Sequence, residues 1–369
     1  MDKARPFSQG IAHMRIAQVA PLGESVPPRK YGGTERIVSY LTEALVEAGH
    51  EVTLYGCAGS QTAARFHCCF PCTLRELPGQ PDLELIYRHV MAEVRAHSRN
   101  FDVVHFHTGW FEFAPFAQSP TPRLTTMHGR LNIPELQQRL RPHPTFPLIS
   151  ISDAQRSPMP ELNWVSTIYH GIPTPWAPPI DASQARPYLT FLGRISPEKR
   201  PDLAIEIAQK SGLPLKIAAK VDPVDREYFE TLIRPMLALP GIEYLGELDD
   251  YEKGRLLAGS CALLFPIDWP EPFGLAMIEA MACGTPVIAF RRGSIPEVVD
   301  EGTTGFIVED VAGAVAALDH IGRLDARTIR ATFDARFSIA RMVEDYVAIY
   351  DRLIAQNTAW PAASYGRQA

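Results

Sequence analysis

Long apolar runs are missing from this sequence. The longest one, residues 256–267, is interrupted by Gly259 and Ser260, whereas a helix that spans a bilayer needs about 20 apolar residues. The first residues also lack the charged, apolar and small-residue segments of a secretion signal, and residues 1–10 are expected to form a loose leader. We therefore expect a cytoplasmic protein that has at most peripheral contact with the inner membrane.

An excess of positive charge is missing as well. The chain has 36 Lys and Arg residues against 42 Asp and Glu residues, which gives a formal net charge of −6. Because surfaces that bind nucleic acid broadly are usually basic, nucleic acid is not an expected partner. The length of 369 residues, with 46% hydrophobic and 21% charged residues, is instead typical of a globular chain of two ordinary domains.

Cysteine is scarce, with 6 residues in the chain. Without a secretion signal, these thiols are expected to stay reduced. His67, Cys68, Cys69 and Cys72 lie close together in the sequence, but their spacing matches no established zinc pattern and no second half-site follows. We expect buried or surface thiols here and no bound metal, although a metal role for this group stays open.

Two phosphate-binding fingerprints are also absent. The chain has no G-x-G-x-x-G, the pattern of nicotinamide and flavin enzymes, and no G-x-x-x-x-G-K-[ST] phosphate loop. A nucleotide that binds this chain must therefore be held by another arrangement.

Strand-like and helix-like segments alternate along the chain, which is typical of α/β proteins. In the first half, the first expected helix carries Ile37, Leu41 and Leu45 on its buried face and ends at Gly49. The strands of this half are expected at 15–20, 51–55, 103–106, 124–127, 148–151 and 165–168.

A proline-rich stretch, residues 173–187, interrupts the alternation and is expected to be a linker. After it, Pro201 is expected to open a helix that ends at Gly212. The strands of the second half are expected at 188–192, 215–218, 242–245, 262–265 and 286–290.

The predicted fold class is therefore α/β, with two Rossmann-like, doubly wound domains joined by a linker. The N-terminal domain is predicted to cover residues 1–182, and the C-terminal domain residues 183–340. The remainder, 341–369, is predicted to hold a helix that crosses back to the first domain, followed by a frayed tail.

A ligand that carries two phosphates can be held without a metal by glycine-rich turns, helix N-termini and Arg or Lys clamps. The first such device is the pair Gly32 and Gly33, within 31–35, directly before the first expected helix. Two glycines let the backbone approach a ligand closely. The alternative is a simple turn in which Thr34 caps the helix.

The second device is a basic loop. A strand is expected to end at Gly193, and Arg194 and Lys199 follow it before the helix at Pro201. Open α/β sheets bind ligands at these carboxyl ends of strands. Taken alone, a solvated loop explains the two basic residues equally well.

The third device follows the expected strand 262–265. A helix is predicted to start near Phe273 or Gly274, with its first N–H groups directed at the cleft. Glu279 stands in the otherwise apolar run of that helix, and an unpaired buried carboxylate is costly. We therefore expect a ligand hydroxyl as its partner; the alternative is an ion pair with a distant arginine.

Glu271 and Glu279, with seven residues between them, match the E-x7-E motif of glycosyltransferase family four, and the chain resembles this family from about residue 15 to 350. The Gly-Arg-x-x-x-x-Lys arrangement that begins at Gly193 resembles its diphosphate clamp, and the Gly-Gly pair resembles its phosphate turn. His170, which begins the segment His-Gly-Ile-Pro, stands where the family's hinge motif usually has Asn.

This resemblance implies a GT-B fold, in which the two domains face a central cleft. It also implies a retaining, metal-independent glycosyltransferase. Such an enzyme moves a hexose from a nucleotide diphosphate sugar, with UDP favoured, to a hydroxyl of a glycan, lipid-linked or small-molecule acceptor. The D-x-D metal clamp of the other large glycosyltransferase fold is absent, so no cofactor or metal is expected. Two alternatives stay open: a nucleotide-sugar 2-epimerase of the same fold, and a non-catalytic nucleotide-sugar-binding protein.

By the same resemblance, Arg194 and Lys199 neutralise the diphosphate as the sugar bond breaks. Glu279 binds the ribose hydroxyls and Glu271 the hydroxyls of the donor sugar. Because these two carboxylates lie on one segment, they are assigned to binding, and the leaving phosphate takes the acceptor proton in a front-face attack. The remaining donor-binding residues are Gly32, Gly33, Phe273, Gly274 and Leu275, and the base is placed near 218–220 and 246–248.

Histidines and aromatic residues of the N-terminal domain complete the expected site. His128 matches a family histidine near the donor sugar, and a histidine that caps a strand edge is the alternative. His107, Trp110 and Phe111 are expected on the acceptor side of the cleft, with a plain core or surface role as the alternative. His105 and His107 share one face of a strand, so a metal there is also considered.

Overall fold

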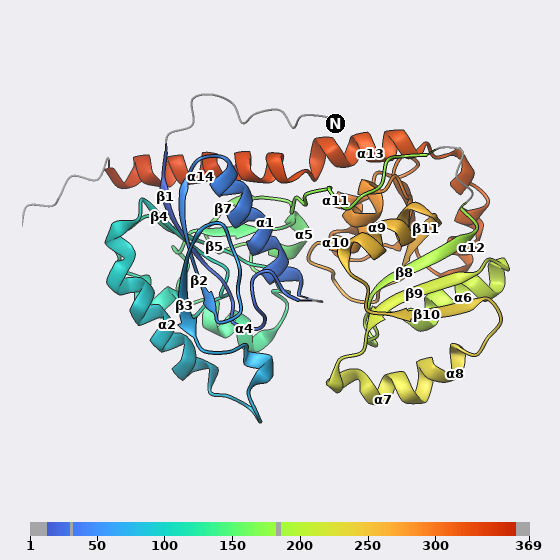
Figure 1. Cartoon of the computed structure of the whole chain (residues 1–369), viewed down its shortest axis with the longest axis horizontal. Helices are drawn as coiled ribbons and strands as arrows, with labels where there is room; N and C mark the ends of the chain where they lie inside the picture. Colours follow the sequence, from blue (N-terminus) through green and yellow to red (C-terminus); the bar gives the residue numbers. More distant parts are fainter. Residues whose placement is uncertain (1–12, 30–31, 182–185, 359–369) are drawn as a thin grey trace, which may run out of the picture.

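The computed structural model describes residues 13–29, 32–181 and 186–358, which form two lobes side by side (Figure 1). The expected leader at 1–10, Tyr31 of the glycine-rich turn and the predicted domain boundary at 182/183 lie outside the described residues. Each lobe contains a parallel β-sheet with helices packed around it. The predicted α/β class of two Rossmann-like domains is therefore confirmed.

Within the described residues, the sheet of the first lobe has seven strands in the order β3-β2-β1-β4-β5-β6-β7. The inner strand β1 is buried from Ile16 to Val19, because both faces of the sheet are covered. The strands are β1 (Arg15–Val19), β2 (Glu51–Cys57), β3 (Arg65–Phe70), β4 (Val103–Phe106), β5 (Arg123–Thr126), β6 (Leu148–Ser150) and β7 (Trp164–Thr167).

The sheet of the second lobe has six strands within the described residues, in the order β10-β9-β8-β11-β12-β13. The central strands β8 and β11 pair in parallel, and their apolar side chains form the centre of this lobe's core. The strands are β8 (Tyr188–Arg194), β9 (Leu215–Lys220), β10 (Ile242–Gly246), β11 (Ser260–Phe265), β12 (Val287–Phe290) and β13 (Gly305–Val308).

Two strands escape the sequence pattern, and both lie at a sheet edge. Among the described strands β3 pairs only with β2, and most of its side chains are exposed or half-buried. β13 pairs with β12 through four residues. An edge strand is partly covered and short, so it lacks the continuous apolar run that marks a central strand.

The described helices include none that is long and apolar enough to cross a membrane. They are α1 (Gly33–Glu47), α2 (Leu83–His97), α3 (Phe113–Phe116), α4 (Pro134–Leu140), α5 (Asp153–Arg156), α6 (Pro201–Ser211), α7 (Arg226–Tyr228), α8 (Arg234–Met236), α9 (Asp250–Ala258), α10 (Leu275–Ala282), α11 (Ile295–Val298), α12 (Val311–Leu318), α13 (Ala326–Arg336) and α14 (Ile339–Thr358).

Helix boundaries follow local sequence signals. Pro201 is the first residue of α6, and Gly212, at φ 71°, ends it in the left-handed conformation that favours glycine. α10 begins at Leu275, one or two residues later than predicted. Gly274 precedes it at φ 89°, which is not a helical conformation.

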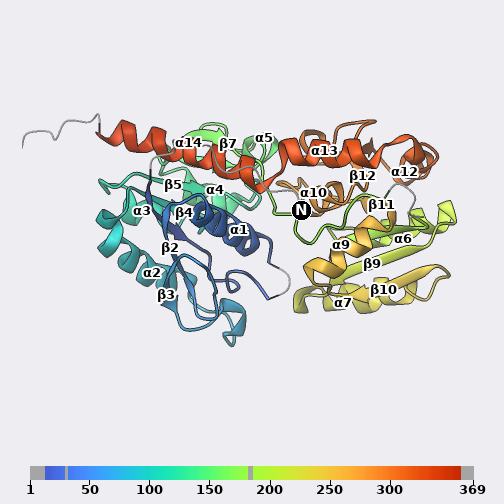
Figure 2. The same cartoon turned by 45° about the horizontal axis from the view of Figure 1, so that its top comes forward.

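Two stretches of chain join the lobes. The first follows β7, and the second reaches Ser338, where it pairs with Ile172 of the first. Gly171 allows this close approach, because a Cβ there would lie 2.3 Å from the carbonyl oxygen of Ser338. α14 then runs along the first lobe beside α1 (Figure 2).

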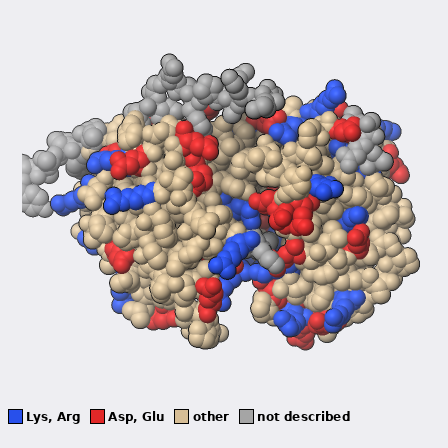
Figure 3. Space-filling view, viewed as in Figure 1, with Lys and Arg blue, Asp and Glu red and all other residues tan. Residues whose placement is uncertain are grey.

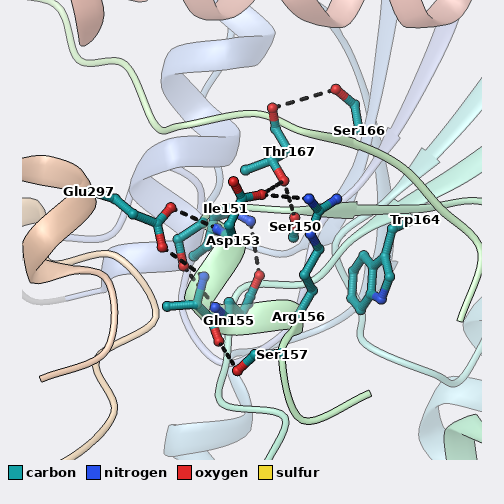
Figure 4. A network of polar contacts seen from close by, with 12 residues as sticks. Ser150, Ile151, Asp153, Gln155, Arg156, Ser157, Trp164, Ser166, Thr167 and Glu297 are labelled. Carbon is teal, nitrogen blue, oxygen red and sulfur yellow. Dashed lines mark hydrogen bonds and ion pairs between the residues drawn. The ribbon is translucent and has the colours of Figure 1, made fainter. Parts of the chain in front are cut away.

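Polar contacts also tie the lobes together. The carboxylate of Glu297, from α11, accepts hydrogen bonds of 2.7 Å from the backbone N–H groups of Asp153 and Ala154 at the start of α5 (Figure 4). It also accepts one of 3.1 Å from the hydroxyl of Tyr169. Glu297 of the second lobe thereby caps a helix of the first.

Candidate active site

A cavity of about 590 Å³ opens between the two lobes, and Figure 3 shows basic and acidic side chains gathered around the hollow between them. Both lobes contribute to its lining. The residues predicted for the donor side that line it are Gly32, Gly33, His128, Arg194, Lys199, Glu271, Phe273, Gly274, Leu275 and Glu279.

Two helices, one from each lobe, begin at this cavity. Gly33 is the first residue of α1 and Leu275 the first of α10; a Cβ on Gly33 would lie 3.6 Å from Cδ1 of Leu275. The first N–H groups of a helix have no partner within it and carry partial positive charge. Two helix N-termini therefore face one narrow space, an arrangement that favours an anion.

Lys199 and Glu271 form a nearly buried pair beside these helix ends. The ammonium of Lys199 donates to the carboxylate of Glu271 at 2.5 Å, and the indole N–H of Trp269 donates to the same oxygen at 2.6 Å. Lys199 also lies over the ring of Trp269, 4.9 Å from its centroid. Both ends of this pair are thereby fixed on the wall of the cavity.

Arg194 lies among acids of its own lobe. It forms an ion pair with Glu198, and its guanidinium nitrogens lie 3.6 Å from Asp222 and 3.5 Å from Asp225. Burial alone would raise the pKa of Asp222, but the hydrogen bond and charge of Lys220 hold it below its ordinary value. Cations and carboxylates are therefore paired with one another in this part of the site.

Glu279 has a partner that the sequence analysis did not expect. Lys253, from α9, donates to its carboxylate at 2.8 Å and to that of Asp250 at 2.9 Å, and Asp250 in turn binds Arg36 of α1 at 2.7 Å. The alternative of an ion pair is therefore present, with a lysine in place of the distant arginine, and the ligand hydroxyl stays a prediction. A lysine 26 residues earlier satisfies the charge, and Glu279 still lines the cavity.

His128 ends a chain of hydrogen bonds through the N-terminal lobe. Its Nε2 lies 2.9 Å from Nδ1 of His107, and Nε2 of His107 lies 2.8 Å from Oε1 of Gln18. Because Oε1 can only accept, His107 donates from Nε2 and accepts from His128. Nδ1 of His128 is then left as an acceptor. Burial lowers the pKa of His128 to about 3, so its ring is neutral at pH 7.

His107, Trp110 and Phe111 are not among the residues that line this cavity, and their acceptor-side role stays a prediction. His107 is buried beneath His128. Phe111 stacks on Tyr87 at 4.1 Å and on Trp110 at 4.3 Å. These aromatic residues pack against the core of the first lobe.

The cavity residues that the sequence analysis missed include Arg36, Arg130, Lys253 and Trp269. Arg36 could have been found, because it lies in the first turn of the helix that follows the Gly-Gly pair. Trp269 lies two residues before the first glutamate of E-x7-E. Arg130 and Lys253 carry no local signal, since their place at the cavity depends on packing.

Two Rossmann-like domains that face one cleft, with helix N-termini from both at its centre, define the GT-B class of glycosyltransferases. AviGT4, a glycosyltransferase involved in avilamycin A biosynthesis, superposes with a TM-score of 0.72 at 25% identity over 93% of this chain and 98% of that one. Anabaena Alr3699/HepE, solved with UDP and glucose, has a TM-score of 0.72 at 17% identity over 92% of this chain and 100% of that one, which shows the fold alone.

The sequence comparisons name the family. The family description Glycosyltransferase Family 4 matches residues 31–194, and Glycosyl transferases group 1 matches residues 176–324. Phosphatidyl-myo-inositol mannosyltransferase of Mycolicibacterium smegmatis is 29% identical over 360 residues, 88% of each chain. D-inositol 3-phosphate glycosyltransferase of the same organism is 30% identical over 179 residues, 46% of this chain and 41% of that protein. The chain belongs to glycosyltransferase family four and is a glycosyltransferase.

Proposed function

We propose that this enzyme moves a hexose from a nucleotide diphosphate sugar, with UDP favoured, to an acceptor hydroxyl, and that it retains the anomeric configuration. The observation that carries the proposal is the convergence of two helix N-termini, Lys199 and Arg194 on one cavity that also exposes Glu271 and Glu279. The helix N-termini and the two cations can bind a diphosphate, and the two carboxylates can accept hydrogen bonds from sugar hydroxyls.

The diphosphate is placed between the N-termini of α1 and α10. As the bond to the sugar breaks, negative charge develops on the leaving phosphate, and fixed N–H groups and cations stabilise it. Lys199 is already held at the cavity wall by Glu271 and Trp269. No resident metal is needed for this role, and the absence of a metal stays a prediction.

The two carboxylates of the E-x7-E motif are assigned to binding. Glu279, held by Lys253, takes the ribose hydroxyls, and Glu271 takes hydroxyls of the donor sugar. Two-carboxylate sugar chemistry needs an acid and a nucleophile on opposite sides of the bond, whereas these two lie on one segment of one lobe. The leaving phosphate therefore takes the acceptor proton in a front-face attack.

His128 is assigned to the donor sugar as a neutral hydrogen-bonding group. Its low pKa excludes a role as a proton-donating imidazolium near pH 7. Nδ1, left as an acceptor by the bond from Nε2 to His107, suits a sugar hydroxyl that donates.

The identity of the acceptor is proposed only as a class. Two relatives are named for acceptors that contain inositol. The first acceptor class to test is therefore a polyol, or a lipid whose headgroup contains a polyol. The cytoplasmic location stays a prediction.

A screen of UDP-, GDP- and ADP-sugars by thermal shift tests the donor. A ligand at 100 times its Kd adds about 2.7 kcal/mol to the free energy of unfolding. We expect one base to be favoured, and hydrolysis or transfer of that donor to fall about 100-fold or more in Lys199→Met. Lys210 is an exposed lysine of the same lobe that forms an ion pair with Glu206; Lys210→Met is the matched control and should keep wild-type activity.

Three outcomes contradict the proposal. Turnover of the donor to its epimer without acceptor identifies the 2-epimerase alternative. Binding with no hydrolysis or transfer under any acceptor identifies the non-catalytic alternative. A product with inverted anomeric configuration, read from its NMR coupling constants, excludes retention.

A further inference from the structure

Outside the cleft, the edge strand β3 and helix α2 bring together three side chains that can bind a metal. A ring nitrogen of His67, the sulfur of Cys69 and a carboxylate oxygen of Glu93 all lie within 4.8 Å of one another. None of the three lines the cavity between the lobes. The cluster is therefore separate from the site described above.

The backbone explains why these residues meet. His67 and Cys69 are two apart on a strand and point to the same face, toward α2. Nε2 of His67 lies 3.2 Å from Oε2 of Glu93, and Nε2 of His89, one turn earlier on α2, lies 3.3 Å from Oε1 of the same carboxylate. Glu93 is thus held between two imidazoles.

The neighbouring thiols do not take part. Cys68 is exposed, and its thiol donates to the carbonyl oxygen of Phe70 at 3.3 Å. Cys72 lies beyond the end of β3. The group of four considered from the sequence is therefore divided: two of its members face α2, and the further ligands come from a helix that the spacing could not reveal.

We propose that His67, Cys69, Glu93 and His89 bind one Zn²⁺ ion. Zn²⁺ accepts this mixture of imidazole, thiolate and carboxylate in tetrahedral geometry. With bonds of about 2.0–2.3 Å, tetrahedral ligand atoms lie about 3.3–3.8 Å apart. The ligand atoms of His67, Cys69 and Glu93 lie within 4.8 Å of one another, so they need a contraction of at most about 1 Å. His89 has an exposed side chain that contacts Glu93, and it must turn toward the other ligands to become the fourth. A thiolate and a carboxylate also balance the charge of the ion.

Four protein ligands leave no open position, so the ion would be structural. It would link the edge strand β3 to α2. An edge strand has backbone N–H and C=O groups that are otherwise open to pairing with another chain. Because a preformed site is rare in an unfolded chain, ion binding would stabilise this part of the lobe.

A cobalt titration of the full chain, stripped of metal beforehand, tests the proposal. We expect one Co²⁺ per chain, visible d–d bands of tetrahedral geometry, and a near-ultraviolet thiolate-to-cobalt band that Zn²⁺ abolishes by competition. Cys69→Ser should remove the near-ultraviolet band. Cys68→Ser, the adjacent thiol on the opposite face, is the matched control and should leave the spectrum unchanged.

Glu93→Gln and His89→Gln, at partly exposed positions, provide variants that do not depend on a buried thiol. Each should weaken Co²⁺ binding by at least the roughly 10–100-fold that loss of an outer-shell partner costs, and Zn²⁺ should raise the Tm of wild type but not of Cys69→Ser or Glu93→Gln. If the wild type binds no Co²⁺, or if Cys69→Ser keeps the charge-transfer band, the proposal is wrong.

Discussion

Charged residues in the cleft have partners within the protein that balance their charge and fix their orientation before a ligand binds. Glu271 is fixed by Lys199 and Trp269, and Glu279 by Lys253. Such pairs limit the conformational entropy that a bound ligand must remove. They also mean that removing one partner leaves the other charge buried, which is more costly than the loss of a single contact.

At this scale, the assignment of Glu279 to the ribose can be tested by combining one protein substitution with one change of ligand. We expect 2′-deoxy-UDP to bind wild type more weakly than UDP by about 1.5–3 kcal/mol, the range of a hydrogen bond to a charged group. In Glu279→Gln the difference in binding free energy between UDP and 2′-deoxy-UDP should fall below about 1 kcal/mol. Calorimetric titration of the four combinations measures it.

Glu252→Gln is the control, because this glutamate lies in the capping box of α9 and not at the cavity. An equal preference for UDP over its 2′-deoxy analogue in wild type and Glu279→Gln would contradict the assignment.

Among the elements, α14 joins the C-terminal end of the chain to the core of the first lobe. Tyr350 lies fully buried. Its hydroxyl accepts from the amide of Gln18 at 3.1 Å and lies 2.8 Å from Nδ1 of His105. Gln18 also receives the hydrogen bond of His107. A helix that follows the second lobe therefore shares a hydrogen-bond network with His128.

Tyr350→Phe should lower the free energy of unfolding by about 1–3 kcal/mol, because it leaves the buried amide of Gln18 and a nitrogen of His105 without this partner. Urea unfolding followed by circular dichroism measures the loss. Tyr251→Phe, at an exposed position on α9, should change stability by less than about 0.5 kcal/mol. Equal stabilities for Tyr350→Phe and wild type would show that the network does not hold α14.

On the scale of the whole molecule, four histidines that meet where the lobes join make stability depend on pH. Burial lowers the pKa of His105, His107 and His170 well below the ordinary value, and that of His128 to about 3. Below pH 6.5 the unfolded chain binds protons at these rings, whereas the folded chain does not. Protons therefore favour unfolding.

We expect the free energy of unfolding to fall as the pH is lowered from 7.5 to 5, and the slope for each histidine to approach about 1.4 kcal/mol per pH unit below 6.5. His170→Asn should reduce the slope by that amount, because Asn does not titrate. His320→Asn, at an exposed position, is the control. The prediction fails if His170→Asn and wild type have parallel stability profiles. Urea unfolding at several pH values measures these slopes.

The sequence by itself determined the elements whose signals are local. Pro201 and Gly212 bound α6, the continuous apolar strands mark the two sheets, and the spacing from Glu271 to Glu279 keeps both carboxylates on one segment at the cavity. These features depend on backbone preference and on burial along a short stretch of chain, so a sequence pattern carries them.

Only the tertiary structure decided which side chains meet. It paired Glu279 with Lys253 and placed Glu93 beside His67 and Cys69. It also directed His107 to His128, and away from the cavity. Edge strands such as β3, half open to solvent, likewise escaped the pattern. Partners far apart along the chain are chosen by packing, because only the assembled lobes fix the distance between them and the burial that makes a partner necessary.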